Sequence, residues 1–286
     1  MTEKIYSFAG FRFVIRSELS IADNEIYKNF ITDNGGKEIT VQIVDSVLPE
    51  KEGKLVYENS TCRFYVSENG EFLYTSYPVK AGESKEFACR VIKDDKITLY
   101  LNGCDELWDA MIMEALKIPE ILLKYDCATL HCSFIDVDGG AVLFAADKQM
   151  GKSTQAALWK KYRNAETING DRAALRIIDG TVYACGIPFC GSSRISVNKI
   201  LPVKAVVFLG KALSNTAAKV DQMNAFIEFL SKLTYEPADE NQLHSALGIA
   251  EYVSRNIPVY KLVCRPDEGA VKALEEKICQ KQNTVV

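Results

Sequence analysis

One stretch near the middle of the chain constrains its fold more than any other. Residues 141–146 form an apolar run that is typical of a buried strand, and a short polar loop follows, ending in Gly151-Lys152-Ser153. A helix-forming segment, residues 155–161, begins almost directly after that loop. A strand, a polar loop, Gly-Lys-Ser and a helix in this order predict a phosphate-binding loop.

The residue types of this loop suit the binding of phosphate. Successive backbone N–H groups and the positive end of a helix dipole attract phosphate oxygens. Gly151 lets the backbone come close, Lys152 adds a positive charge, and the Ser153 hydroxyl can bind Mg²⁺. We therefore expect nucleotide phosphates to bind to one continuous set of residues. That set is Ala146, Asp147, Lys148, Gln149, Met150, Gly151, Lys152, Ser153 and Thr154.

The loop departs from the usual pattern at its first position, where Ala146 stands in place of glycine. Alanine is costly there if the backbone needs a positive φ, and costs little if φ is negative. The alternative interpretation of the whole stretch is an ordinary strand-to-helix turn that carries a solvated lysine.

Length and composition indicate a soluble globular protein. A chain of 286 residues, with 48% hydrophobic and 25% charged residues, predicts one large domain or two unequal ones. The formal charge of −4 argues against a nucleic-acid partner. No apolar run approaches the roughly 20 residues that cross a bilayer, and residues 1–6 lack an apolar signal core. We expect a cytoplasmic protein, whose nine scattered cysteines are mostly reduced, buried thiols.

Residues 1–103 predict a β-rich N-terminal domain. Short runs of β-branched and aromatic residues alternate with turn signals such as Asn34-Gly35-Gly36, and no long helix separates them. Because parallel strands need a long crossover, we expect mostly antiparallel pairing. The expected strands are residues 6–15, 38–44, 62–66, 72–77, 87–92 and 97–101.

Residues 104–286 predict an α/β domain with a mixed sheet, built around the phosphate loop. Helical spacing runs from Asp105, a candidate N-cap, to Tyr125, with a break or a second short helix expected at Pro119. A hairpin through residues 138–140 should lead into the strand before the loop. The later expected strands are residues 173–178, 181–184, 201–210 and 258–264, and the later helices are 222–232, 240–255 and 267–279.

Three further residues could carry chemistry near the loop. His131 lies one hairpin away from the loop, and the alternative is that it is a core histidine whose hydrogen bonds are satisfied. Asp171 follows a strand shortly after the loop and could hold the second side of a Mg²⁺ ion, or could be a turn aspartate. Arg194, in a loop rich in glycine and serine, could clamp a phosphate or carboxylate, or could be an ordinary surface residue.

The order of these motifs resembles a known family. Leu130-His131-Cys132-Ser133, a hairpin, the phosphate loop and Asn169-Gly170-Asp171-Arg172 follow one another as in the catalytic domain of HPr serine kinase/phosphorylase and its relatives. Those proteins in turn look like the ATP-dependent phosphoenolpyruvate carboxykinases in their nucleotide-binding core. The resemblance covers about residues 127–265. The N-terminal region looks like the leader region of the HPr-kinase-like group.

The resemblance implies a role for several residues. His131 matches the family histidine beside the transferring phosphate, while Lys152 and Ser153 match the loop lysine and the Mg²⁺ hydroxyl. The family usually has two adjacent aspartates, one acting as the base and one on the metal. Here the pair is Gly170-Asp171, so Asp171 matches the metal partner and the base position is empty. The long glycine-rich signature that contacts HPr is absent from this sequence.

Two functions therefore compete. The first is a kinase-like enzyme that transfers the terminal phosphoryl group of Mg-ATP to a hydroxyl of an unidentified protein, peptide or small molecule, with His131, Lys152, Asp171 and Arg194 as its catalytic residues. The second is a non-catalytic nucleotide-binding module that has lost its base. An ordinary phosphate-loop ATPase is disfavoured, because residues 201–210 do not end in aspartate. The relatives form oligomers, so the resemblance leaves a homo-oligomer open.

Overall fold

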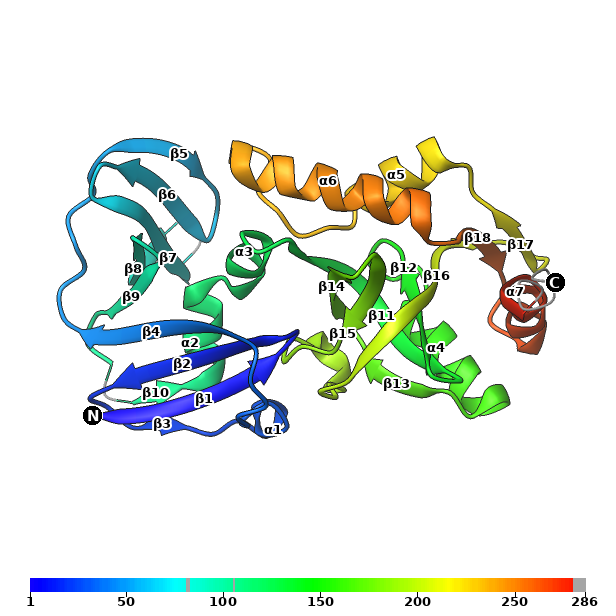
Figure 1. The fold of residues 1–286 in the computed structure, drawn as a ribbon, viewed down its shortest axis with the longest axis horizontal. Coiled ribbons are helices and arrows are strands. Elements are labelled where there is room, and N and C mark those ends of the chain that lie inside the picture. The colour runs from blue at the N-terminus through cyan, green and yellow to red at the C-terminus, as the bar shows by residue number, and fades with distance from the viewer. Residues whose placement is uncertain (81–82, 105, 280–286) are drawn as a thin grey trace. The chain divides into compact units, whose positions relative to one another are not determined.

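The computed structural model describes residues 1–80, 83–104 and 106–279, and its chain folds into two compact units (Figure 1). The first unit takes residues 1–121 and 236–240, and the second takes residues 122–235 together with the chain from residue 241 onward. The first unit thus extends past residue 103, where the N-terminal domain was expected to end. Within the described residues, no helix has the length and apolar character that crossing a membrane requires.

The first unit is built on an eight-stranded sheet with the order β1-β2-β4-β9-β8-β7-β6-β5. Five of its pairings are antiparallel, so the mostly antiparallel region predicted from the sequence is confirmed. The strands are β1 (Thr2–Phe8), β2 (Phe11–Ser17), β4 (Lys37–Asp45), β5 (Lys54–Glu58), β6 (Cys62–Ser67), β7 (Gly70–Lys80), β8 (Glu83–Lys93) and β9 (Lys96–Leu101). A small parallel pair, β3 (Ile21–Ala22) and β10 (Leu107–Trp108), and the short helix α1 (Glu25–Lys28) complete the strand-rich part.

Two details of this sheet differ from the sequence prediction. The single strand expected over residues 6–15 is a hairpin, because Ala9 and Gly10 both adopt positive φ, at 51° and 74°. In addition, β4 pairs in parallel with both β2 and β9. Parallel strands need a long connection between them, and both connections are long here. Residues 18–36 connect β2 to β4, and the β5–β8 meander connects β4 to β9, so neither connection needs a long helix.

The helical segment predicted after residue 104 forms two helices, α2 (Asp109–Leu116) and the short α3 (Ile118–Leu123), and residue 105 lies outside the described residues. The break falls at Lys117, whose φ of 50° ends α2 in a left-handed conformation. Pro119 lies in the first turn of α3, where a missing backbone N–H costs nothing. The break was thus predicted correctly, but two residues too late.

The second unit contains a mixed sheet with the order β12-β11-β14-β15-β16-β18-β17. Because β12 also pairs in parallel with β16, the pairings of β12, β11, β14, β15 and β16 form a closed cycle, and β13 pairs with β11 outside it. The elements are β11 (Cys127–Val137), β12 (Gly140–Ala145), α4 (Lys152–Arg163), β13 (Glu166–Asn169), β14 (Arg172–Ile178), β15 (Thr181–Cys185), a 3₁₀ turn (Gly191–Ser193), β16 (Ile200–Lys211), β17 (Thr216–Lys219), α5 (Gln222–Leu230), α6 (Glu240–Asn256), β18 (Val259–Cys264) and α7 (Glu268–Cys279). The predicted mixed α/β class is confirmed.

Strand β12 is buried on both faces, which explains its unbroken apolar run. Successive side chains point to opposite faces of a strand. Leu143 accordingly packs in a core with residues of α5 and α6, whereas Phe144 packs in a second core with residues of α4 and α7. Figure 1 shows α5 and α6 on one side of these strands and α4 on the other. The loop after β12 is therefore anchored by two separate apolar layers.

Candidate functional site

The loop between β12 and α4 has the backbone of a phosphate-binding loop. Gln149 and Gly151 adopt positive φ, at 65° and 102°. Gly151 is the N-cap of α4, and no side chain caps that end of the helix. The first N–H groups of α4 therefore have no side-chain acceptor, and the positive end of the helix dipole faces the loop. Ala146 has no positive φ, so alanine fits this position without strain.

Lys152 is the most enclosed charged group of the loop, with only 9% of its surface exposed. Its Nζ donates to the backbone oxygen of Ala146 at 2.9 Å and lies 2.9 Å from Nε2 of His131. Burial lowers the pKa of this lysine, and the nearby carboxylate of Asp171 opposes that shift. A lysine ammonium enclosed in this way is stabilised by a nearby anion, so the site favours a negatively charged ligand.

His131 links the lysine to a carboxylate. While its Nε2 faces Lys152, its Nδ1 lies 3.5 Å from Oδ1 of Asp171. Burial, and then the charge of Lys152, lower the pKa of His131, and Asp171 raises it in part. A histidine with a lowered pKa is neutral at pH 7, so it can accept a proton. The structure thus brings together three of the four predicted catalytic residues.

Asp171 is held in place by the turn before it. The fully buried Asn169 accepts hydrogen bonds from the backbone N–H groups of Asp171 and Arg172, both at 2.9 Å, and donates to the oxygen of Ile187 at 2.8 Å. The Asp171 backbone oxygen also accepts from the N–H of Cys132, at 2.9 Å. Nε of Arg172 donates to the Asp171 carboxylate at 3.2 Å.

The structure gives a physical reason for glycine at residue 170. A Cβ at this position would lie closer than 3.0 Å to both Cβ and Oγ of Ser193. Ser193 is fixed because its Oγ donates to the backbone oxygen of Cys190 at 2.6 Å. Ser193 therefore fills the space that a side chain at residue 170 would need.

The loop that carries Arg194 passes close to Asp171. A Cβ on Gly191 would lie 2.9 Å from Cγ of Asp171, so this glycine permits the approach. Asp171 and Arg194 both influence the pKa of Cys190, which burial raises, so both charges lie near that thiol. Arg194 itself is exposed and has a φ of 54°. Its predicted role as a clamp stays a prediction.

The remaining predicted residues lie at the solvent-facing side of the loop. Lys148, Ser153 and Thr154 are exposed. Asp147 is exposed as well, and its carboxylate accepts from Nζ of Lys232 at 2.6 Å. Lys232, which follows α5, was not predicted as part of the site, because its 85-residue separation from Asp147 hides the contact in the sequence.

Among the described residues, no group of three or more histidine, cysteine, aspartate or glutamate side chains could hold a metal ion. The predicted magnesium ligands are the carboxylate of Asp171 and the hydroxyl of Ser153, while the Asp147 carboxylate in the same loop is paired with Lys232. Mg²⁺ is commonly held by one or two carboxylates together with water and substrate phosphates. The donor types therefore suit a magnesium ion that arrives with a nucleotide.

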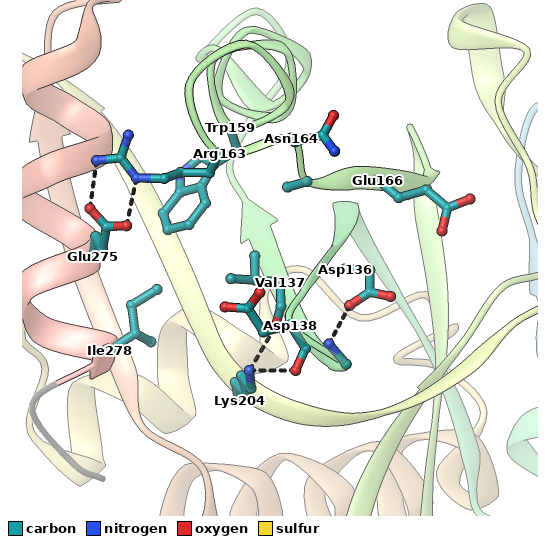
Figure 2. Close-up of a pocket in the computed structure, with 12 residues that line it drawn as sticks. Asp136, Val137, Asp138, Trp159, Arg163, Asn164, Glu166, Lys204, Glu275 and Ile278 are labelled. Carbon is teal, nitrogen blue, oxygen red and sulfur yellow. Dashed lines mark hydrogen bonds and ion pairs between the residues drawn. The ribbon is translucent and has the colours of Figure 1, made fainter. Parts of the chain in front are cut away.

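A separate cavity of about 490 Å³ lies at the other end of α4, between that helix, the β11–β12 hairpin and α7 (Figure 2). The carboxylates of Asp136, Asp138, Glu166 and Glu275 belong to its lining. Its cations are already engaged, since Arg163 pairs with Glu275 and Nζ of Lys204 donates to the backbone oxygens of Val137 and Asp138. The carboxyl end of a helix dipole also disfavours anions, so this cavity is not the phosphate site.

Comparison with known proteins adds little beyond the fold. No family model matches the chain, and no curated protein matches it. Among solved structures, it is similar to the HPr(Ser) kinase/phosphatase from Coxiella burnetii, with 14% sequence identity and a TM-score of 0.32, over 55% of this chain and 95% of that one. A likeness this distant concerns the fold alone, and no residue is assigned from it.

Proposed function

We propose that the second unit binds a magnesium-bound nucleoside triphosphate and transfers its terminal phosphoryl group to a hydroxyl of a protein, peptide or small molecule. One observation carries the proposal. The enclosed ammonium of Lys152 and the uncapped first turn of α4 point at the same loop, and a neutral His131, backed by Asp171, lies next to that ammonium.

Phosphate binding follows from the loop itself. The backbone N–H groups that lead into α4 would donate to phosphate oxygens, and Lys152 would turn from the Ala146 oxygen and His131 to a phosphate. Ser153 and Asp171 would hold the magnesium ion, which neutralises charge that develops on the phosphates. Lys232, whose positive charge contributes to lowering the pKa of Lys152, adds to the positive field.

His131 offers a replacement for the missing carboxylate base. Once Lys152 donates to a phosphate, Nε2 of His131 becomes an acceptor for the proton of an attacking hydroxyl, while Nδ1 stays directed at Asp171. General-base help of this kind is worth ~10²- to 10⁴-fold, and positioning and charge neutralisation supply much of the rest. The empty position at Gly170 therefore does not by itself remove phosphoryl transfer.

A calorimetric titration with Mg-ATP tests the binding step. Lys152→Ala should weaken binding by at least tenfold, whereas Lys160→Ala, which removes an exposed lysine of the same helix, should leave it unchanged. Equal affinity of both variants and the wild-type chain would refute the site.

The release of γ-phosphate from ATP to water then tests catalysis without a known acceptor. His131→Asn should slow the release by about 10²-fold or more, with little change in ATP affinity. The second candidate, a nucleotide-binding module without catalysis, is favoured by the way Ser193 fills the base position. Tight ATP binding with no release of phosphate, even after prolonged incubation, would select the module.

A further inference from the structure

A cavity of about 360 Å³ adjoins the phosphate loop and has not been given a role so far. It is bordered by Met150 and Gly151 of the loop and by Gln155 on the first turns of α4. Its far wall comes from the ends of β16 and β18, at Lys211, Cys264 and Arg265. Its volume falls within the range of small-molecule sites, about 300–1,000 Å³.

The position of this cavity in the sheet is significant. β12, β16 and β18 run parallel, so their carboxyl ends meet at one edge of the sheet, and the cavity lies outside that edge. In open α/β sheets, ligands bind in crevices outside the carboxyl ends of parallel strands. A group joined to phosphates on the loop would therefore reach this cavity directly.

Gln155 gives a second, independent reason to expect a ligand. The residue is only 2% exposed, and its Nε2 donates to Sγ of Cys264 at 3.2 Å. Its Oε1 is buried and has no partner. A buried polar atom without a hydrogen bond is costly, and native proteins keep few of them without a function. Because Gln155 borders the cavity, a ligand bound there would bring an N–H donor near this unpartnered oxygen.

The rest of the lining suits a flat ring. Met150, Ala212 and Pro266 supply apolar surface, and the exposed Lys211 and Arg265 flank the strand ends with positive charge. A nucleoside base has apolar faces and polar edges, and it is attached to the polyanion that the neighbouring loop is proposed to bind. The chemistry of the two subsites therefore corresponds to two parts of one molecule.

We propose that this cavity binds the base of the nucleotide and that the unpartnered Oε1 of Gln155 accepts a hydrogen bond from an exocyclic amino group, as on adenine. This inference rests on the proposed function of the loop. It adds a specificity-determining residue, Gln155, at a helix position where the sequence pattern alone indicates only a helix former.

The first test compares ligands on the wild-type chain, by calorimetry in the presence of Mg²⁺. ATP should bind more tightly than inorganic tripolyphosphate, and purine riboside triphosphate, which lacks only the amino group, should bind about tenfold more weakly than ATP. If neither ATP nor tripolyphosphate binds, the phosphate site itself is wrong. If tripolyphosphate binds as tightly as ATP, only the base subsite is wrong.

The second test changes the protein. Gln155→Leu should remove the difference between ATP and purine riboside triphosphate, while it leaves the affinity for tripolyphosphate unchanged. The matched change Gln222→Leu, at an exposed position on α5, should preserve the difference. If water alone satisfies Oε1, the wild-type chain will bind the two triphosphates equally, and the proposal is overturned. That comparison needs no variant, so it decides the matter even if Gln155→Leu fails to fold.

Discussion

The crowding at Gly170 yields a prediction whose size can be worked out from the structure. Gly170→Ala adds one methyl group, which would lie closer than 3.0 Å to Cβ and Oγ of Ser193. Rotation of the hydroxyl cannot relieve the contact with Cβ, so the loop must shift. Overpacking of this kind costs ~1–3 kcal/mol, and loss of the Ser193–Cys190 hydrogen bond adds about 1 kcal/mol. We expect a total destabilisation of ~2–4 kcal/mol.

Urea denaturation followed by tryptophan fluorescence measures this loss. Trp159 is buried in the second unit, and a Trp108→Phe background leaves it as the single reporter. The matched control is Gly248→Ala on α6, where a Cβ meets nothing within 4 Å. That variant should be stabilised by up to about 1 kcal/mol, because alanine favours the helix over glycine.

Removing the obstacle should restore the stability. Ser193→Gly combined with Gly170→Ala should recover ~1–2 kcal/mol relative to the sum of the two single changes. If Gly170→Ala unfolds within about 0.5 kcal/mol of the wild-type chain, Ser193 does not block the position, and the explanation of the missing aspartate is wrong. If the double variant shows no coupling, the cost arises elsewhere.

Three further changes test other parts of the structure. Gly151→Ala places a residue with a Cβ at a φ of 102°, so it should destabilise the second unit by ~1–3 kcal/mol in the same urea denaturation assay. An unchanged stability would mean that the loop has another backbone conformation. The pKa of His131 is lowered in the fold, so wild-type stability should fall as the pH drops below about 6.5 towards the folded-state pKa. The variant His131→Gln should lack this pH-dependent loss. Parallel pH profiles of the two proteins would contradict the lowered pKa of His131. In the first unit, Asp109 is fully buried and accepts hydrogen bonds from Lys4 and Tyr6. Asp109→Ala should therefore lower the free energy of unfolding by ~3–5 kcal/mol, measured by thermal unfolding. A loss below about 1 kcal/mol would show that these contacts are not formed.

The local parts of the fold could be predicted from the sequence. The apolar run of β12, the Gly-Lys-Ser sequence and the following helix are all signals within about 20 residues, and they fixed the type of each element. The hairpin at Ala9 and Gly10 was missed, because alanine rarely adopts a positive φ and gives no turn signal. The parallel pairing of β4 was missed because strand neighbours depend on contacts far apart in the chain.

The same distinction holds for the candidate site. His131, Lys152 and Asp171 were predicted from motifs, and the structure brings these three side chains together. The crowding of Gly170 by Ser193 comes from a loop 23 residues away, which no local pattern records. Gln155 reads in the sequence as an ordinary helix former. Only its burial, and an oxygen without a partner, mark it as a candidate ligand contact.

Titration of the intact chain with Mg-ATP, beside the Lys152→Ala and Lys160→Ala variants, addresses the binding of a polyanion at the loop most directly. Saturable one-site binding that is lost with Lys152→Ala and kept with Lys160→Ala is the result expected from the uncapped helix and the enclosed ammonium. Absence of binding to the wild-type chain, or binding that is indifferent to Lys152, would contradict the proposed phosphate site.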